Sequence, residues 1–555
     1  MRIALGAKGL PALHLTRGGR PRGFNASPAL RRPFYHRLPH LSLSRFPGRP
    51  VVRAQKARCD PRLPPRRKDA IKSSDGTLRD TAPPGLAKQA AGSVLGATAL
   101  ITGSTVGAGM LALPAATAGG GFFPSAGIMT VTWGFLILEA LLIAEVNLTI
   151  MKKQQARGET PRVVTLRQMA AETLGPTGGK VTSYVYLFLS YTLLVAYIAK
   201  GSELVNLLSM DAIPASAGGP LFAFIMGAFL FREDTESVDV VNRALTLGLL
   251  AVFGVLVAGG ASIADWGSLL HHQDWGQAWG ALPVVFLSLV FHDLIPVLCN
   301  YLGGDKGRVR TAVVAGGVVP LAMFLVWNAV ALSLVPGAVD VANAGGIIDP
   351  LRVLIESLGP SAGLAIEVFS LLAIATSFIG TMLGFSDYLR SEIKGWEKQK
   401  LFDGLVPKPE EGGEGEGGIL GDEASKLAAI SLALVPPTLA AATSPDLFYL
   451  ATQVAGGYGI TLLYGILPPL MAWSVRPVGT VNQRFAPLMP MVPGGRKVLA
   501  SITSCAAAIE VGKLAADSSG LASGLATVGS KVGTVTNLVI GDLAAFESSA
   551  HLGHW

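Results

Sequence analysis

The chain has 555 residues, of which half are hydrophobic and only 15% are charged, whereas soluble globular domains carry roughly 25% charged residues. This composition excludes an ordinary soluble protein and indicates an integral membrane protein of helical type. The formal charge of +8 does not indicate a nucleic-acid partner, because 13 of the 45 Lys and Arg residues lie in residues 1–59 and the rest of the chain carries 32 basic against 37 acidic residues.

Residues 1–59 are rich in Arg, contain no Asp or Glu, and have no apolar run long enough for a secretory signal. This pattern is typical of an organellar transit peptide, and a disordered basic arm is the alternative. We favour the chloroplast envelope inner membrane as the destination over the mitochondrial inner membrane. Residues 60–92 are basic and Pro-rich and are interpreted as a linker. The three cysteines, Cys59, Cys299 and Cys505, lie too far apart in the sequence to indicate a disulfide framework or a metal site.

Eleven apolar stretches follow, each of a length suited to a membrane span. They cover residues 93–118, 125–150, 181–207, 214–231, 241–261, 280–302, 311–335, 362–388, 427–443, 447–473 and 496–515. The first ten are predicted to form a transporter core over residues 93–473, with an inner loop and an eleventh span in residues 474–515. An acidic, Gly-rich stretch, 409–423, separates the eighth and ninth spans as a disordered inner loop, and the tail, 516–555, is left unassigned.

The first apolar stretch contains the segment GSTVGAGMLALP, from Gly103 to Pro114. Gly is about 1 kcal/mol and Pro about 3 kcal/mol worse than Ala inside a helix, so the helix is predicted to break there, at membrane depth. Irregular backbone is tolerated in lipid only where it is buried in protein or lines a cavity, so the freed N–H and C=O groups are expected to face a binding site. Close helix packing through the GxxxG pair of Gly103 and Gly107 is the alternative. A dinucleotide-binding loop would need a preceding strand.

A second interrupted stretch, Gly280 to Leu302, carries His292, Asp293 and Pro296 near its centre. Broken segments in corresponding positions of two halves of a chain are typical of secondary transporters with inverted repeats. Because the broken stretches are the first and the sixth, we predict an all-α membrane protein whose core divides into five plus five helices.

Lys and Arg residues are unevenly distributed between the spans. The loops after the second and sixth spans hold six and three of them, whereas the loops around Asp211, Ala264–Gln277 and Pro336–Pro350 hold none. By the positive-inside rule, the N-terminus lies inside. Three Trp residues fall in or beside the outer loop before the sixth span, where an aromatic belt is expected: Trp266, Trp275 and Trp279.

Ionisable residues inside the spans are candidates for coupling transport to an ion, because a charge at the bilayer centre costs at least roughly 2.5 kcal/mol. Glu139 lies in the middle of the second span, and Glu145 lies nearer its inner end, from which it could instead reach the inner surface. His292 can take up a proton near neutral pH, and Asp293 follows it. A His satisfied by a freed carbonyl is the alternative interpretation of His292.

Other polar residues in the spans have less specific interpretations. Thr376 and Ser377 in the eighth span offer hydroxyls that could coordinate a small cation or bond back to their own helix. Lys200 and Glu203 are three residues apart in the third span and are predicted to form an ion pair with each other.

Five segments then occur in a characteristic order. They are TALITGSTVGAGMLALP in the first span, EVNL at Glu145–Leu148, the pattern S-x-x-F-H-x-x-x-P at Ser288–Pro296 followed by YLGGD, VVPLAMFLVWN at Val318–Asn328, and ATSFIGTMLGFSDYL at Ala375–Leu389. In this order they resemble the tyrosine/tryptophan permease family of the amino acid, polyamine and organocation transporters. The resemblance covers about residues 93–473 and leaves out the leader, the acidic stretch and the tail.

The resemblance implies proton-coupled symport of aromatic amino acids by alternating access, on a five-plus-five fold. It implies that the substrate carboxylate binds main-chain amides from Ser104 to Gly109, that the ammonium lies near carbonyls of the broken spans, and that Phe291 lines the side-chain pocket. A half-helix N-terminus favours an anion. Where relatives read Ser-Phe-Gly-Phe-His, this chain has Val290 in place of the glycine that would ease unwinding. The substrate-binding candidates are Gly103, Ser104, Thr105, Gly107, Ala108, Gly109, Ser288 and Phe291.

The predicted function is therefore secondary active transport, with an amino acid, a coupling ion and membrane lipid as partners and with the proton favoured over sodium. Sodium-coupled or exchange transport of another amino acid or small zwitterion is the alternative. A channel would need a continuous polar pore, and the chain has no filter-like repeat. An enzyme would need catalytic partners for His292 and Asp293, yet no HExxH or GxSxG motif is present, so no enzyme activity, cofactor or metal is predicted.

Overall fold

The computed structural model describes residues 92–158, 163–271, 273–334, 360–402, 421–443, 447–476 and 490–517. Several predicted features lie outside the described residues: the transit peptide, the linker up to residue 91, the outer loop Pro336–Pro350, most of the acidic stretch, and the tail from residue 518.

The described part of the chain is helical, and no strand occurs in it. The helices are α1 (Val94–Thr105), α2 (Gly109–Thr117), α3 (Phe122–Ala156), α4 (Leu166–Leu208), α5 (Ala215–Arg232), α6 (Thr235–Ile263), α7 (Trp275–Ala278), α8 (Leu282–Leu289), α9 (Ile295–Tyr301), α10 (Lys306–Ser333), α13 (Pro360–Phe402), α14 (Asp422–Thr443), α15 (Leu447–Val454), α16 (Leu467–Val475) and α17 (Gly495–Asp517). Three short 3₁₀ turns, η1 (Ser268–Leu270), η2 (Trp279–Ala281) and η3 (His292–Leu294), and one π-helix, η4 (Ala455–Ile466), complete the described elements.

Ten helices, two of them made of several consecutive elements, are long and apolar enough to cross a membrane. The bent pair of α1 and α2 makes an eleventh. Each of the eleven predicted spans thus corresponds to a candidate membrane helix, and α17 is the candidate for the last. We number the spans 1 to 11 in chain order. Span 1 is α1 with α2, span 6 runs from α7 to α9, and span 10 runs from α15 through η4 to α16.

Span 3 begins well before residue 181, where the apolar pattern starts, because α4 begins at Leu166. Thr165 and Gln168 form a capping box there: the Thr165 hydroxyl accepts from the Gln168 amide at 3.3 Å, and the Thr165 amide donates to the Gln168 side chain at 3.1 Å. This box satisfies two amides at the helix start. The basic residues that follow it, predicted to lie in an inner loop, are therefore on α4.

The spans pair in a pattern that repeats after five. Span 1 packs against span 7 and span 6 against span 2; span 3 packs against span 4 and span 8 against span 9; span 5 packs against span 8 and span 10 against span 3. Because five is an odd number, the second set of five enters the membrane from the opposite side, so the repeat is inverted. The five-plus-five fold with discontinuous spans 1 and 6 is therefore confirmed.

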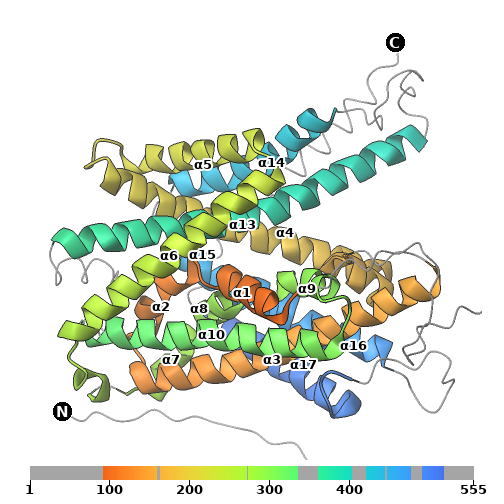
Figure 1. Ribbon diagram of the computed structural model, residues 1–555, viewed down its shortest axis with the longest axis horizontal. Helices are drawn as coiled ribbons and strands as arrows, with labels where there is room; N and C mark the ends of the chain where they lie inside the picture. Colours follow the sequence, from red (N-terminus) through yellow and green to blue (C-terminus); the bar gives the residue numbers. More distant parts are fainter. Residues whose placement is uncertain are drawn as a thin grey trace, which may run out of the picture. The chain divides into compact units, whose positions relative to one another are not determined.

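The core spans fall into two groups. Spans 3, 4, 8 and 9 form one group, in which α5 and α14 lie side by side, and spans 1, 2, 6 and 7 form the other, which includes α1, α3 and α10 (Figure 1). Within the second group α2 contacts α8, so the broken halves of spans 1 and 6 meet.

Two smaller predictions concern single side chains. Lys200 donates to Glu203 at 2.7 Å, which confirms the predicted pair. Trp266, Trp275 and Trp279 are each about half exposed or more, as expected for side chains at a membrane interface.

Candidate functional site

Span 1 is interrupted between Thr105, where α1 ends, and Gly109, where α2 begins, and its two halves are bent by 60°. The predicted break is confirmed, but it is shorter than the glycine and proline pattern indicates. Gly103 and Ser104 are still helical, and Pro114 lies inside α2.

Pro114 is tolerated in α2 because its missing N–H is replaced from another span. A proline in a helix leaves the carbonyl four residues earlier without its donor, and here that carbonyl belongs to Met110. The indole Nε1 of Trp327, from α10, donates to the Met110 carbonyl at 3.0 Å, and both side chains are fully buried. Span 7 therefore holds the helix together at the position where sequence propensity predicts that it breaks.

The main-chain amides at the break differ in their partners. The amide of Ala108 donates to the Ser377 hydroxyl of α13 at 2.8 Å. The amides of Gly107 and Gly109 have no hydrogen-bond partner among the described residues. The carbonyls of Gly103, Ser104 and Thr105 lie in the last turn of α1 and receive no hydrogen bond from the helix, because its last bond runs from the Val106 amide to the Thr102 carbonyl. The break thus presents donors with partial positive charge beside acceptors with partial negative charge.

The glycines of the break also allow other spans to approach closely. A Cβ on Gly107 would lie 2.3 Å from Ser377 Oγ, and a Cβ on Gly109 would lie 2.8 Å from the Cα of Ser288. A Cβ on Gly103 would make only an ordinary contact, 3.5 Å from Thr246. Close packing, the alternative interpretation of the GxxxG pair, therefore applies to Gly107 and not to Gly103.

Span 6 breaks after Leu289, where α8 ends. Val290 is extended, with φ of −77° and ψ of 136°, a conformation that β-branched residues favour. The break therefore forms with a valine, and no glycine is needed at this position. Phe291 is buried, whereas the hydroxyl of Ser288 donates to the Val284 carbonyl at 2.7 Å. The Ser288 hydroxyl has thus used its hydrogen, and both its oxygen and the main chain can still accept from a ligand.

His292 is buried against span 2. Its Nε2 lies 3.0 Å from the carbonyl oxygen of Leu136 on α3. Because a carbonyl only accepts, Nε2 must carry the hydrogen, and in the neutral ring Nδ1 is then an acceptor. Nδ1 is buried and has no partner among the described residues. The interpretation of His292 as satisfied by a carbonyl is right for one nitrogen, and the other can accept a proton.

Glu139 is fully buried on α3, and neither of its carboxylate oxygens has a hydrogen-bond partner in the described part of the chain. It follows Leu136 by three residues, so its side chain lies on the same helix face, near the carbonyl that His292 contacts. An isolated ionised carboxylate is very costly to bury. Glu139 and His292 are therefore two buried titratable groups of spans 2 and 6, and no hydrogen bond joins them in the described part of the chain.

Asp293 has a partner that the sequence does not indicate. The hydroxyl of Tyr464, in η4 of span 10, donates to Asp293 Oδ1, and the Tyr464 ring lies 5.0 Å from the His292 ring. Tyr464 is buried, whereas Asp293 is exposed. Sequence reasoning missed Tyr464, although the Gly-rich run AGGYG at Ala455–Gly459 marks span 10 as irregular.

Glu145 is placed apart from these groups. It accepts from Arg476 Nε at 2.7 Å and from Arg476 Nη2 at 2.9 Å, and also from the Met491 amide at 2.9 Å. Arg476 in turn donates to the Val492 carbonyl at 3.0 Å. The ion pair is buried and links span 2 to the segment between spans 10 and 11. Glu145 does not join the break, and we assign it a structural role as the partner of Arg476.

The two hydroxyls of span 8 differ in orientation. Thr376 donates back to the carbonyls of Leu372 and Ala373, at 2.9 and 3.1 Å, as expected for a hydroxyl satisfied by its own helix. Ser377 faces span 1 and caps the amide of Ala108. Of this predicted cation pair, only Ser377 reaches the break.

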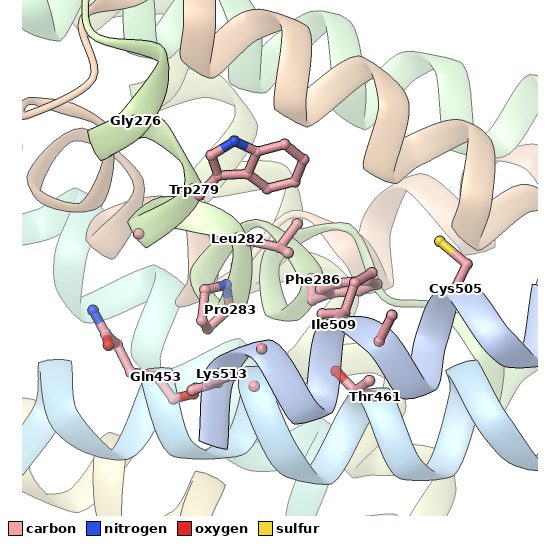
Figure 2. A pocket seen from close by; sticks show the side chains of 14 residues that line it. Gly276, Trp279, Leu282, Pro283, Phe286, Gln453, Thr461, Cys505, Ile509 and Lys513 are labelled. Atoms are coloured by element: carbon pink, nitrogen blue, oxygen red, sulfur yellow. The ribbon is translucent and has the colours of Figure 1, made fainter. Parts of the chain in front are cut away.

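The structure contains a cavity of about 620 Å³ that lies away from both breaks. It is bounded by α8, η4 and α17, and Figure 2 shows Cys505, Ile509 and Lys513 of α17 around it, opposite Pro283 and Phe286 of α8. None of the predicted substrate-binding or ion-coupling residues lines it. Because it lies apart from the predicted residues, we do not assign it to the substrate.

Residues 90–403 and 420–512 match the tryptophan/tyrosine permease family. The chain belongs to this family. It is 27% identical over 393 residues to tyrosine-specific transport system 1 of Haemophilus influenzae, covering 69% of this chain and 88% of that protein. It is 28% identical over 411 residues to a tryptophan-specific transport protein of the same organism, covering 68% of this chain and 95% of that protein. The solved structure of MhsT in complex with L-phenylalanine covers 75% of this chain and 98% of its own, with 15% identity and a TM-score of 0.47.

Membership in this family confirms the resemblance that the five sequence segments indicate. The protein is a multi-pass membrane permease for amino acids and not an enzyme. The identity of its substrate, its coupling ion and its membrane are proposals.

Proposed function

We propose that this permease is a proton-coupled symporter of aromatic amino acids, tyrosine or tryptophan, across an organellar membrane. The observation that carries the proposal is the meeting of two helix breaks, at which unpartnered amides of span 1 lie against the end of α8. The names of the relatives support the aromatic class of substrate.

The substrate is proposed to bind by its main-chain groups. Its carboxylate would accept from the amides of Gly107 and Gly109, at the start of α2, where the helix dipole favours an anion. Its ammonium would donate to carbonyls at the ends of α1 and α8, including that of Ser288. The amides of Ser104 and Thr105 donate hydrogen bonds inside α1. We therefore propose that only the amides of Gly107 and Gly109 bind the carboxylate. Phe291 would border the side-chain pocket.

The coupling proton is proposed to bind among Glu139, His292 and Asp293. Two of these groups are buried without a full set of partners, and the third is exposed. A proton could thus enter from water at Asp293 and be held deeper, at His292 or Glu139. His292→Gln keeps a hydrogen-bonding amide but takes up no proton near neutrality, so it should slow accumulation while exchange of bound substrate persists. Full proton-driven accumulation by this variant would show that Glu139 or Asp293, and not His292, binds the coupling proton.

Sodium is the second candidate, because the Ser377 hydroxyl lies at the span 1 break. Its oxygen already accepts from Ala108, and Thr376 bonds back to its own helix. The proton is therefore favoured. In a sodium mechanism Ser377→Ala would abolish sodium dependence, whereas in the proton mechanism it should weaken the break without changing the coupling ion.

The deciding experiment is counterflow and uptake in proteoliposomes with a panel of twenty amino acids at two pH values. We expect saturable exchange of tyrosine or tryptophan that rises with an inward pH gradient, survives replacement of sodium by choline, and collapses with a protonophore. Amino acid amides, which lack the carboxylate, should not compete. Sodium-dependent uptake that does not respond to the pH gradient would overturn the proposed proton coupling. Strong competition by amino acid amides would overturn the proposed binding of the carboxylate by Gly107 and Gly109.

A further inference from the structure

Span 10 contacts the break of span 6 through an irregular segment. The π-helix η4 covers twelve residues, Ala455–Ile466, whereas π-helices usually occur as single turns and often at functional sites. A Cβ on Gly456 would lie 1.9 Å from the Pro283 carbonyl, so only glycine lets the backbones of η4 and α8 approach this closely. This approach sets Tyr464 beside span 6.

Tyr464 makes two contacts with the break, and each has a different chemical character. Its ring lies 5.0 Å from the ring of His292, and its hydroxyl donates to Asp293 Oδ1. The tyrosine is 1% exposed and Asp293 is exposed, so this hydrogen bond is partly buried, with its carboxylate end the accessible one. The bond joins span 10 to the start of η3 and α9, the inner half of span 6.

The strength of this hydrogen bond depends on the charge of Asp293. An ionised carboxylate accepts from a phenol roughly twice as strongly as a neutral acceptor does. When a proton from water binds to the carboxylate, that extra strength is lost. Among the described residues, the other titratable groups that interact with the pair are His292 of η3 and Tyr186 of α4. A proton delivered to Asp293 therefore acts directly on the link between spans 6 and 10.

We propose that Tyr464 is a positioning residue that latches the inner half of span 6 to span 10 while Asp293 is ionised and releases it when Asp293 is protonated. The inference rests on the proton-coupled transport proposed above and adds to it a device by which the proton changes the conformation. Tyr464 neither binds the substrate nor stores the proton; it acts through Asp293.

The chain contains its own reporter of this latch. Cys299 lies on α9, is fully buried, and follows Asp293 by six residues. Because α9 packs against α3, release of α9 should make the Cys299 thiol reachable. With Cys59 and Cys505 replaced by Ser, Cys299 is the only thiol in the chain. The rate of its reaction with N-ethylmaleimide then measures release without requiring any transport.

The test compares Tyr464→Phe with this parent at each pH from 5 to 8. The variant keeps the ring against His292 and removes only the hydroxyl. At pH 8 Cys299 should react about tenfold faster in the variant, which is the order expected for loss of a hydrogen bond to a charged group. As the pH falls, the ratio of the two rates should approach one, because protonation releases the parent as well. Taking the ratio at each pH cancels the pH dependence of the thiol reaction.

Tyr191→Phe is the matched control. The Tyr191 hydroxyl also joins two spans, donating at 3.0 Å to the Leu432 carbonyl, but this acceptor does not titrate. Its loss should not change the pH dependence of Cys299 labelling. Asp293→Asn supplies a neutral acceptor and should give fast labelling that no longer follows the parent's pH profile.

Two results would overturn the latch. One is labelling of Cys299 in Tyr464→Phe at the parent rate at every pH. The other is a rate ratio that stays constant with pH, which would mean that Tyr464 only stabilises the fold. Because labelling is measured without substrate, failure of proton-driven uptake with a normal labelling profile would instead contradict the proposed function and leave the latch standing.

Discussion

Gly107 offers a sharp test of the span 1 break, because the steric conflict that it avoids involves one removable atom. A Cβ at this position would lie 2.3 Å from Ser377 Oγ but 3.7 Å from Ser377 Cβ. Gly107→Ala should therefore clash with the hydroxyl alone. Overpacking of this kind costs about 1–3 kcal/mol. Gly103→Ala, four residues earlier, should be nearly neutral, since its nearest contact would be 3.5 Å.

Ser377→Ala removes the clashing atom and also the acceptor of the Ala108 amide. Alone, it should cost about 1–3 kcal/mol, because a buried donor loses its partner. Combined with Gly107→Ala, it should cost little more than it does alone, so the two effects would differ from additivity by about 1–3 kcal/mol.

The pair Gly109→Ala and Ser288→Ala is the matched control, because there the Ser288 Cα, at 2.8 Å, would remain in the way. No rescue is expected in that pair. For each pair, unfolding in mixed micelles measures the free energy of unfolding of the parent, the two single variants and the double variant. Uptake in proteoliposomes measures their function in parallel. Strict additivity of Gly107→Ala and Ser377→Ala would refute the packing argument.

Other predictions follow from single contacts. Glu145→Gln should destabilise the fold by about 3–5 kcal/mol, because it leaves Arg476 buried without its counter-charge; unfolding in micelles checks this, and an altered proton dependence of uptake in the folded fraction would contradict our structural assignment. Removal of residues 1–59 should leave a chain that inserts in membranes but no longer reaches its organelle, as a fluorescent fusion would report; unchanged targeting would show that the address lies elsewhere. Asp234 lies outside the spans, and its hydrogen bond to Ser237 lowers its pKa from the usual 3.8. Its stabilising effect is present above that value and is lost as the pH falls through the lowered one, so Asp234→Ala should reduce the thermal midpoint at neutral pH and have little effect in strong acid.

The sequence is sufficient to predict the eleven spans because their signal is local. Apolar runs of membrane length, the Gly-rich break of span 1 and the shared motifs all lie within single segments. The partners of the polar residues are not local. Glu145 bonds to Arg476 and Ala108 to Ser377, across hundreds of residues, and no pattern in either segment indicates the other. The same limit explains why the sequence does not indicate Tyr464.

Propensity also fails at two positions for the same reason. Pro114 is predicted to break span 1 and does not, because Trp327 supplies the missing donor from another span. Val290 stands in place of a glycine that would ease unwinding, yet the predicted break of span 6 forms, because the chain there is extended, which suits a β-branched residue. In both cases the residue's intrinsic preference is correct, and the tertiary surroundings decide its effect.

The placement of the span 1 break connects binding to movement. The Ala108 amide bonds to α13, in the group of spans 3, 4, 8 and 9, whereas Gly109 packs against Ser288, in the group of spans 1, 2, 6 and 7. The break therefore lies at the junction of the two groups. Alternating access in this kind of fold moves one such group against the other, and that motion must strain or re-form the bond between Ala108 and Ser377. The unpartnered amides of Gly107 and Gly109 flank this bond, so a carboxylate held by them would be held more tightly in one arrangement of the groups than in the other. A ligand shifts a conformational equilibrium only through such a difference in affinity, and the geometry of this break is suited to provide one.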